Sequence, residues 1–80
     1  MTLDVLKTGN AAKIVKVEGE GAMRKRLLDM GLTPKTVVKL YKKAPMGDPI
    51  EIIVRGYHLT LRLKEARNIH LTELSEDNKR

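Results

Sequence analysis

The sequence has 80 residues, which is the length of one small domain and leaves no room for a deep substrate pocket beside a hydrophobic core. It contains no Cys, so disulfide bonds, a thiolate nucleophile and thiolate metal ligands are excluded. A formal net charge of +6 permits nucleic acid, anionic lipid or an acidic protein surface as a partner.

The N-terminus lacks the pattern of a signal peptide, and no apolar run approaches the roughly 20 residues that cross a bilayer. We therefore expect a cytoplasmic protein without membrane insertion. Residues 2–6 favour a single helical turn with Thr2 as its cap and two leucines directed toward the core.

A first strand is predicted over residues 13–18. Its apolar residues are Ile14, Val15 and Val17. Because these three do not alternate strictly between two faces, we expect a β-bulge, or a strand that is covered on both faces.

A short helix is predicted over residues 22–30. Its apolar stripe, with spacing i, i+4 and i+7, consists of Met23, Leu27 and Met30. Gly31 stands where a left-handed residue ends a helix, and Leu32 is expected to fold back onto Leu27 in a Schellman motif. Pro34 prevents the helix from resuming.

The rest of the chain is predicted to be β-structure with one further helical turn. The expected strands are residues 36–42, 50–55, 58–62 and 69–74. A loop over residues 43–49 joins the first two of these strands. Gly56 and Tyr57 suit a two-residue type II′ hairpin turn, and residues 63–68 form the helical turn.

Five short strands with one helix after the first predict a mainly β fold, a small and partly closed SH3-like barrel. An OB-like barrel is the structural alternative, although its helix normally falls later in the chain. The domain is expected to span residues 1–74, and the polar residues 75–80 are expected to form a disordered tail.

No set of side chains matches a catalytic centre. Ser75 is the only Ser, and no nucleophile, base and orienting residue can be grouped. Residues 19–21 (Gly-Glu-Gly) lack the Lys of a phosphate-binding loop and indicate a turn. His58 and His70 should point outward and could meet across neighbouring strands, but exposed histidines on small barrels are usually polar surface. We predict no enzyme activity, no cofactor and no metal site.

Several motifs that follow one another along the chain resemble those of a single family. They are residues 26–34 (Arg-Leu-Leu-Asp-Met-Gly-Leu-Thr-Pro), residues 44–50 (Ala-Pro-Met-Gly-Asp-Pro-Ile), and the shorter segments 3–9, 59–62 and 65–69. Together they extend over nearly the whole chain, to Leu74. On these motifs the sequence resembles the FeoA family.

The resemblance implies a cytosolic, non-enzymatic SH3-like domain that accompanies FeoB, a bacterial membrane permease for Fe²⁺ with a cytosolic GTP-binding domain. Docking on the cytosolic side of that permease is the implied function. A free-standing regulatory domain, similar to the one that ends iron-dependent repressors, is an alternative. Lys35 departs from the family, which commonly has Gly after this Pro, and we expect a type I turn there because Lys disfavours a positive φ. Ala12 also replaces a common Gly.

Two features are candidates for the docking surface. Leu28 lies beside the helix's apolar stripe, between Arg24 and Lys25, and could enter a partner's apolar pocket edged with acids; alternatively, it widens the buried stripe. Met46 lies at the tip of a loop stiffened by two prolines; alternatively, it folds inward. We hypothesise one docking face that consists of Arg24, Lys25, Leu28, Met46, Gly47 and Asp48.

Nucleic-acid binding is the main competing function. Residues 24–26, together with Lys42 and Lys43, could contact phosphates. Barrels that bind single strands stack bases on aromatic rings, however, and Tyr41 and Tyr57 are the only aromatic residues of this type here. The same shortage argues against the Pro-rich ligands of true SH3 domains. A homo-oligomer formed through exposed strand edges is a third alternative.

Overall fold

The computed structural model describes residues 1–74. Its elements in chain order are the 3-10 turn η1 (Leu3–Val5), β1 (Ala11–Val17), α1 (Gly21–Asp29), β2 (Val37–Lys43), β3 (Ile50–Val54), β4 (Tyr57–Leu61), α2 (Leu63–Ala66) and β5 (Ile69–Glu73). Every predicted element is present, with ends within two residues of the predicted ones. The predicted tail, residues 75–80, lies outside the described residues. None of the helices in residues 1–74 is long and apolar enough to cross a membrane.

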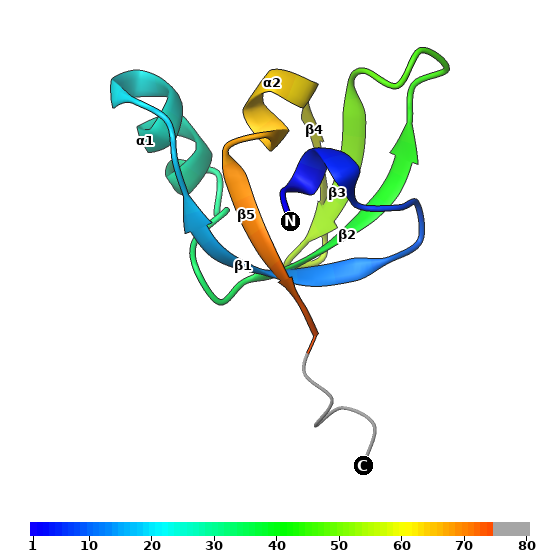
Figure 1. The fold of residues 1–80 in the computed structure, drawn as a ribbon, viewed down its shortest axis with the longest axis horizontal. Helices are drawn as coiled ribbons and strands as arrows, with labels where there is room; N and C mark the ends of the chain where they lie inside the picture. Colours follow the sequence, from blue (N-terminus) through cyan, green and yellow to red (C-terminus); the bar gives the residue numbers. More distant parts are fainter. Residues whose placement is uncertain (75–80) are drawn as a thin grey trace.

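The strands form one antiparallel sheet in the order β4-β3-β2-β1-β5. Figure 1 shows the sheet curling, with β4 and β5 as its two edges and with α2 above the space that it encloses. Alternate side chains of the strands point inward and are buried, among them Ile14, Val38, Leu40, Ile52, Val54, Leu61, Ile69 and Leu71. The mainly β, five-stranded and partly closed architecture is confirmed.

The N-terminal turn packs as predicted but is capped differently. Leu3 and Leu6 are buried in the core. The Thr2 hydroxyl donates to the Asp4 carboxylate and accepts no hydrogen bond from a backbone amide of the turn, so the predicted cap is wrong. Thr2 instead forms an isolated bridge with His70 of β5, which fixes the start of the chain to the sheet edge.

β1 contains the predicted bulge. Its pairing with β5 shifts register between Ile14 and Lys16, which leaves Val15 as the extra residue. Val15 is exposed, whereas Ile14 and Val17 are buried. The bulge explains why the apolar residues of this strand do not alternate in the sequence.

α1 ends in the predicted Schellman motif. The Gly31 amide donates to the Leu28 carbonyl at 2.9 Å, and the Leu32 amide donates to the Leu27 carbonyl at 3.2 Å. Gly31 takes the expected left-handed conformation, with φ of 97°. Leu27 and Leu32 are both buried, so the stop also closes this end of the core.

The turn before β2 is of a different type from the prediction. Lys35 has φ of 76°, and the Thr36 amide donates to the Thr33 carbonyl at 3.1 Å, as in a type II turn. The predicted type I turn is therefore wrong. The Lys35 amide donates to the Ile14 carbonyl at 2.7 Å, and this bond to β1 helps to offset the roughly 1–2 kcal/mol that a left-handed residue costs.

The β3–β4 hairpin turns one residue earlier than predicted. Its central residues are Arg55, with φ of 52°, and Gly56, with φ of 86°. Positive φ at both positions is the pattern of a type I′ turn, so the predicted type II′ turn is wrong. Tyr57 already pairs with Val54 in the ladder. The Arg55 guanidinium donates to the Thr36 hydroxyl at 2.9 Å, which ties this turn to the one before β2.

Candidate functional site

The basic residues predicted on α1 are engaged within the molecule. The Arg24 Nε donates to the Val17 carbonyl at 2.9 Å. The Lys25 ammonium pairs with the Asp29 carboxylate at 2.9 Å, although both side chains are exposed. Leu28 is half-buried and packs against the core. The structure therefore favours the interpretation in which Leu28 widens the buried stripe.

A buried carboxylate, which sequence reasoning missed, fastens α1 to α2. Glu65 is buried, accepts a hydrogen bond from the Arg62 amide at 2.9 Å and pairs with the Arg26 guanidinium. Burial alone raises the pKa of Glu65, but the Arg62 amide and the Arg26 guanidinium together hold it below the ordinary value of 4.5. This ionised carboxylate therefore has a structural partner and is not poised for acid–base chemistry.

The loop over residues 44–49, which we call the methionine loop, is fixed at its base. The Gly47 amide donates to the Ala44 carbonyl at 2.7 Å, and the Ala44 amide donates to the Pro49 carbonyl at 2.9 Å. The Leu63 amide of α2 donates to Asp48 Oδ1 at 3.1 Å. Met46 is 92% exposed at the tip, so the interpretation in which it folds inward is wrong.

The structure does not bring the two sets of predicted docking residues together. Figure 1 shows α1 and the methionine loop at opposite ends of the molecule. After α1 the chain runs the length of β2, seven residues or about 23 Å of extended backbone, before the loop begins. Arg24, Lys25 and Leu28 therefore lie on one surface, and Met46, Gly47 and Asp48 lie on another. The six residues therefore do not form one continuous surface.

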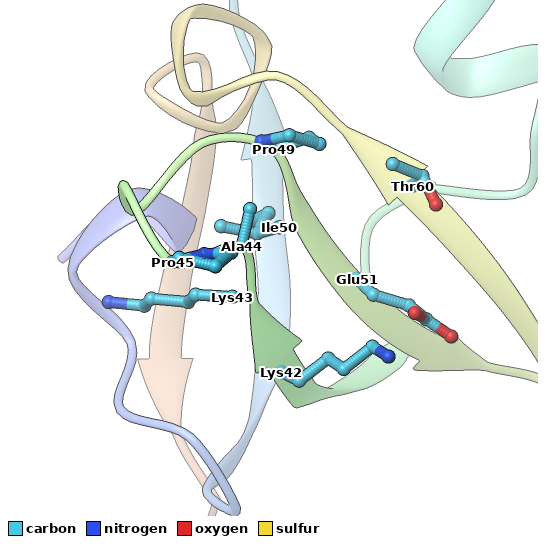
Figure 2. Close-up of a pocket in the computed structure, with 8 residues that line it drawn as sticks. All are labelled: Lys42, Lys43, Ala44, Pro45, Pro49, Ile50, Glu51 and Thr60. Atoms are coloured by element: carbon cyan, nitrogen blue, oxygen red, sulfur yellow. The ribbon is translucent and has the colours of Figure 1, made fainter.

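A hollow of about 340 Å³ lies on the β2–β3 side of the methionine loop. It is lined by Lys42, Lys43, Ala44, Pro45, Pro49, Ile50, Glu51 and Thr60. Figure 2 shows the Lys42 side chain extending toward Glu51, and Lys43 extending away from both. The Glu51 carboxylate is hydrogen-bonded to His58 Nδ1 at 2.6 Å. The walls of the hollow are apolar at the loop and cationic at the end of β2.

A second hollow, of about 440 Å³, lies on the α2 side of the same loop. Its lining residues are Asp48, Arg62, Leu63, Lys64 and Arg67. These cations were not predicted from the sequence. In the folded chain, the hydrogen bond from the Leu63 amide to Asp48 brings α2 beside the loop. The cluster of basic residues around the helical turn was the available signal.

Both tyrosine rings make contacts within the molecule. The Tyr57 hydroxyl donates to the Met30 carbonyl and holds the ring against the end of α1. The Tyr41 ring lies edge-on to the His58 ring, with 4.8 Å between the centroids and 79° between the planes. Neither arrangement offers two free aromatic faces in a row, which weakens the case for stacked nucleic-acid bases.

The two histidines point outward as predicted and lie on the opposite edge strands. His58 of β4 contacts Glu51, and His70 of β5 contacts Glu18 at 2.7 Å. The His70 imidazole and the nearby Lys16 ammonium lower the pKa of the exposed Glu18 carboxyl. Within residues 1–74, no three metal-ligating side chains come close enough together to hold an ion.

Comparisons with known proteins agree on one family. The model of the FeoA domain matches residues 1–73. An Fe(2+) transport protein A/Fe(2+) transporter FeoB fusion protein of Porphyromonas gingivalis is 36% identical over 77 residues, which are 96% of this chain and 9% of the fusion protein. The chain thus spans a small part of that curated relative.

Two solved structures show the same fold. The solution structure of the FeoA protein of Chlorobium tepidum is 41% identical, with a TM-score of 0.86 over 94% of this chain and 71% of that one. The crystal structure of Stenotrophomonas maltophilia FeoA in complex with zinc, described as an SH3 domain protein, is 26% identical, with a TM-score of 0.80 over 90% of this chain and 89% of that one. The SH3-like fold class is thereby confirmed.

Proposed function

This chain belongs to the FeoA domain family, and from this premise we propose that it is a non-enzymatic, cytosolic accessory domain of bacterial ferrous iron uptake that docks onto a FeoB-type permease. The family is linked to ferrous iron transport. The docking, the cytosolic location and the absence of catalysis are the proposal.

The fusion protein of Porphyromonas gingivalis is the observation that carries the proposal. In that relative, a domain similar to this chain is covalently joined to the transporter. A covalent link holds two domains at a high effective concentration. Such a link serves domains that act together, so it supports an interaction between the corresponding domains of separate chains. We therefore expect the separate chain to bind the corresponding permease.

The methionine loop is the proposed main contact, through Met46, Gly47 and Asp48. Three hydrogen bonds and two prolines already order the backbone of this loop, so binding sacrifices little conformational entropy. A large exposed apolar side chain on an ordered loop can fill a partner's pocket. The surface with Arg24, Lys25 and Leu28 is the second candidate, although its side chains already have contacts within the domain.

Binding to the permease tests the proposal directly. The cytosolic region of the FeoB-type permease from the same bacterium is immobilised, and the purified chain is passed over it. We expect saturable binding, and we expect Fe²⁺ uptake in cells to fall when the gene for this chain is deleted. Absence of binding together with unchanged uptake would contradict the proposed function.

A further inference from the structure

The methionine loop lies between two groups of basic side chains. Lys42 and Lys43 line the hollow on one side, and Arg62, Lys64 and Arg67 line the hollow on the other. We call these five residues the basic collar. They come from two segments that are separated in the sequence, and the bond between Asp48 and the Leu63 amide keeps the segments side by side.

The basic collar is poorly neutralised within the domain. In the described part of the chain, its only ion pair joins Arg67 Nε to Asp4 Oδ2 at 3.8 Å. By contrast, Lys16, Lys25 and Arg26 each lie within 3.2 Å of a carboxylate oxygen.

The acids that line the two hollows are engaged in other contacts. Asp48 accepts a hydrogen bond from the Leu63 amide, and Glu51 contacts His58. The five cations of the collar outnumber these two carboxylates, so a net positive charge faces a partner.

From this arrangement we infer that the basic collar and Met46 bind an acidic protein surface, in which a small apolar pocket receives the Met46 side chain and carboxylates meet the collar. This inference rests on the proposed docking function and specifies the chemistry of the partner. Opposite charges around an apolar anchor fix its orientation and raise the association rate.

A protein fits this surface better than a membrane or a nucleic acid. Met46 is the one large apolar side chain at the loop tip, and stable membrane anchoring needs more buried apolar area than one residue provides. Nucleic acid would engage the cations but would leave Met46 without a partner, and Tyr41 already stacks edge-on against His58.

A titration of the isotope-labelled full chain, followed through its amide NMR signals, tests the inference without the permease. The probe is a ten-residue peptide rich in aspartate with two leucines, and the control peptide carries asparagine in place of aspartate. We expect shifts concentrated at residues 42–49 and 62–67 and binding at least about tenfold tighter for the acidic peptide. Shifts centred on α1, or equal binding of the two peptides, would overturn the inference.

Two exposed helical lysines, Lys64 of the collar on α2 and Lys25 outside it on α1, provide matched variants. Lys64→Glu should weaken binding of the acidic peptide about fivefold, and Lys25→Glu, the same charge reversal on α1, should change it less than about twofold. Both lysines are exposed, so both variants should remain folded. Equal losses would mean that net charge alone, and not the collar, attracts the peptide.

Further arms distinguish the other partners and separate this inference from the proposed function. Tighter binding of vesicles containing one-third phosphatidylserine, or of a single-stranded oligonucleotide, would assign the collar to a membrane or to nucleic acid and overturn the inference. If the permease region binds the wild-type chain and Lys64→Glu equally well, the inference fails and the docking function stands. If the acidic peptide binds at the collar but the permease does not bind, the docking function fails and the surface assignment stands.

Discussion

The α1 end and the methionine-loop end have similar residues but place them in different surroundings. Each combines basic side chains with an apolar one. At the α1 end, Arg24 donates to a backbone carbonyl, Lys25 pairs with Asp29, and Leu28 packs against the core. At the loop end, Met46 is 92% exposed beside the basic collar. The difference teaches that composition alone does not identify a binding surface, because contacts within the fold determine which side chains remain free.

The largest expected effect is the difference in stability between a substitution in the core of the α1 end and one at the exposed tip of the methionine loop. Leu27→Ala on α1 should lower the free energy of unfolding by about 3 kcal/mol, because Leu27 is fully buried. Met46→Ala should change it by less than about 0.5 kcal/mol. Urea denaturation followed by circular dichroism measures both values. A loss above about 1 kcal/mol for Met46→Ala would show that Met46 supports the fold, which would contradict the contrast between the two ends.

Two glycines, one at each end, give a smaller and closely matched contrast. Both have positive φ, 97° at Gly31 and 89° at Gly47. A Cβ on Gly31 would lie 2.9 Å from the Tyr57 hydroxyl oxygen, whereas a Cβ on Gly47 would meet nothing within 4 Å. Gly31→Ala should therefore lower the free energy of unfolding by about 2–3 kcal/mol, and Gly47→Ala should lower it by about 1 kcal/mol. Thermal unfolding of the two variants measures both losses of stability. Equal losses would contradict the predicted difference between the two glycines.

The smallest expected effect is a pH dependence of the contact between Glu65 of α2 and Arg26 of α1. The folded-state pKa of Glu65 is lowered, so its stabilising contribution is present above the unfolded value, near 4.5, and is lost as the pH falls through the folded value. Unfolding free energies measured from pH 6 to pH 3 should fall less steeply for Glu65→Gln than for the wild type. Met46→Ala should keep the wild-type slope. An unchanged slope in Glu65→Gln would show that this carboxylate does not stabilise the contact between α1 and α2.

Local patterns in the sequence were sufficient to predict the fold. Alternation in β3, the stop at Gly31 and the broken alternation at Val15 each depend on neighbours within a few residues. The turns at Lys35 and Arg55 were predicted incorrectly. At Lys35 the left-handed backbone is accompanied by a tertiary hydrogen bond to Ile14, and at Arg55 by a side-chain bond to Thr36, which local preferences do not contain.

The candidate site was predictable only in part. The exposed Met46 follows from a loop with two prolines and an apolar residue between them. The basic collar does not, because β2 and α2 are separated by two strands in the sequence, and the hydrogen bond from the Leu63 amide to Asp48 brings α2 beside the loop only in the folded chain. Likewise, the contact of Arg24 with the Val17 carbonyl could not be seen before the fold placed β1 beside α1, whereas the i, i+4 pair of Lys25 and Asp29 lies within one helix and was open to prediction. Long-range contacts therefore decide which of the predicted residues remain available.

The most direct measurement is the affinity of the permease's cytosolic region for the wild-type chain, Met46→Ala and Lys25→Ala, determined by titration calorimetry at one salt concentration. Met46→Ala should weaken binding about tenfold, which corresponds to about 1.4 kcal/mol, while Lys25→Ala stays within about twofold of the wild type. Wild-type affinity in Met46→Ala, or a larger loss in Lys25→Ala, would contradict docking through the methionine loop.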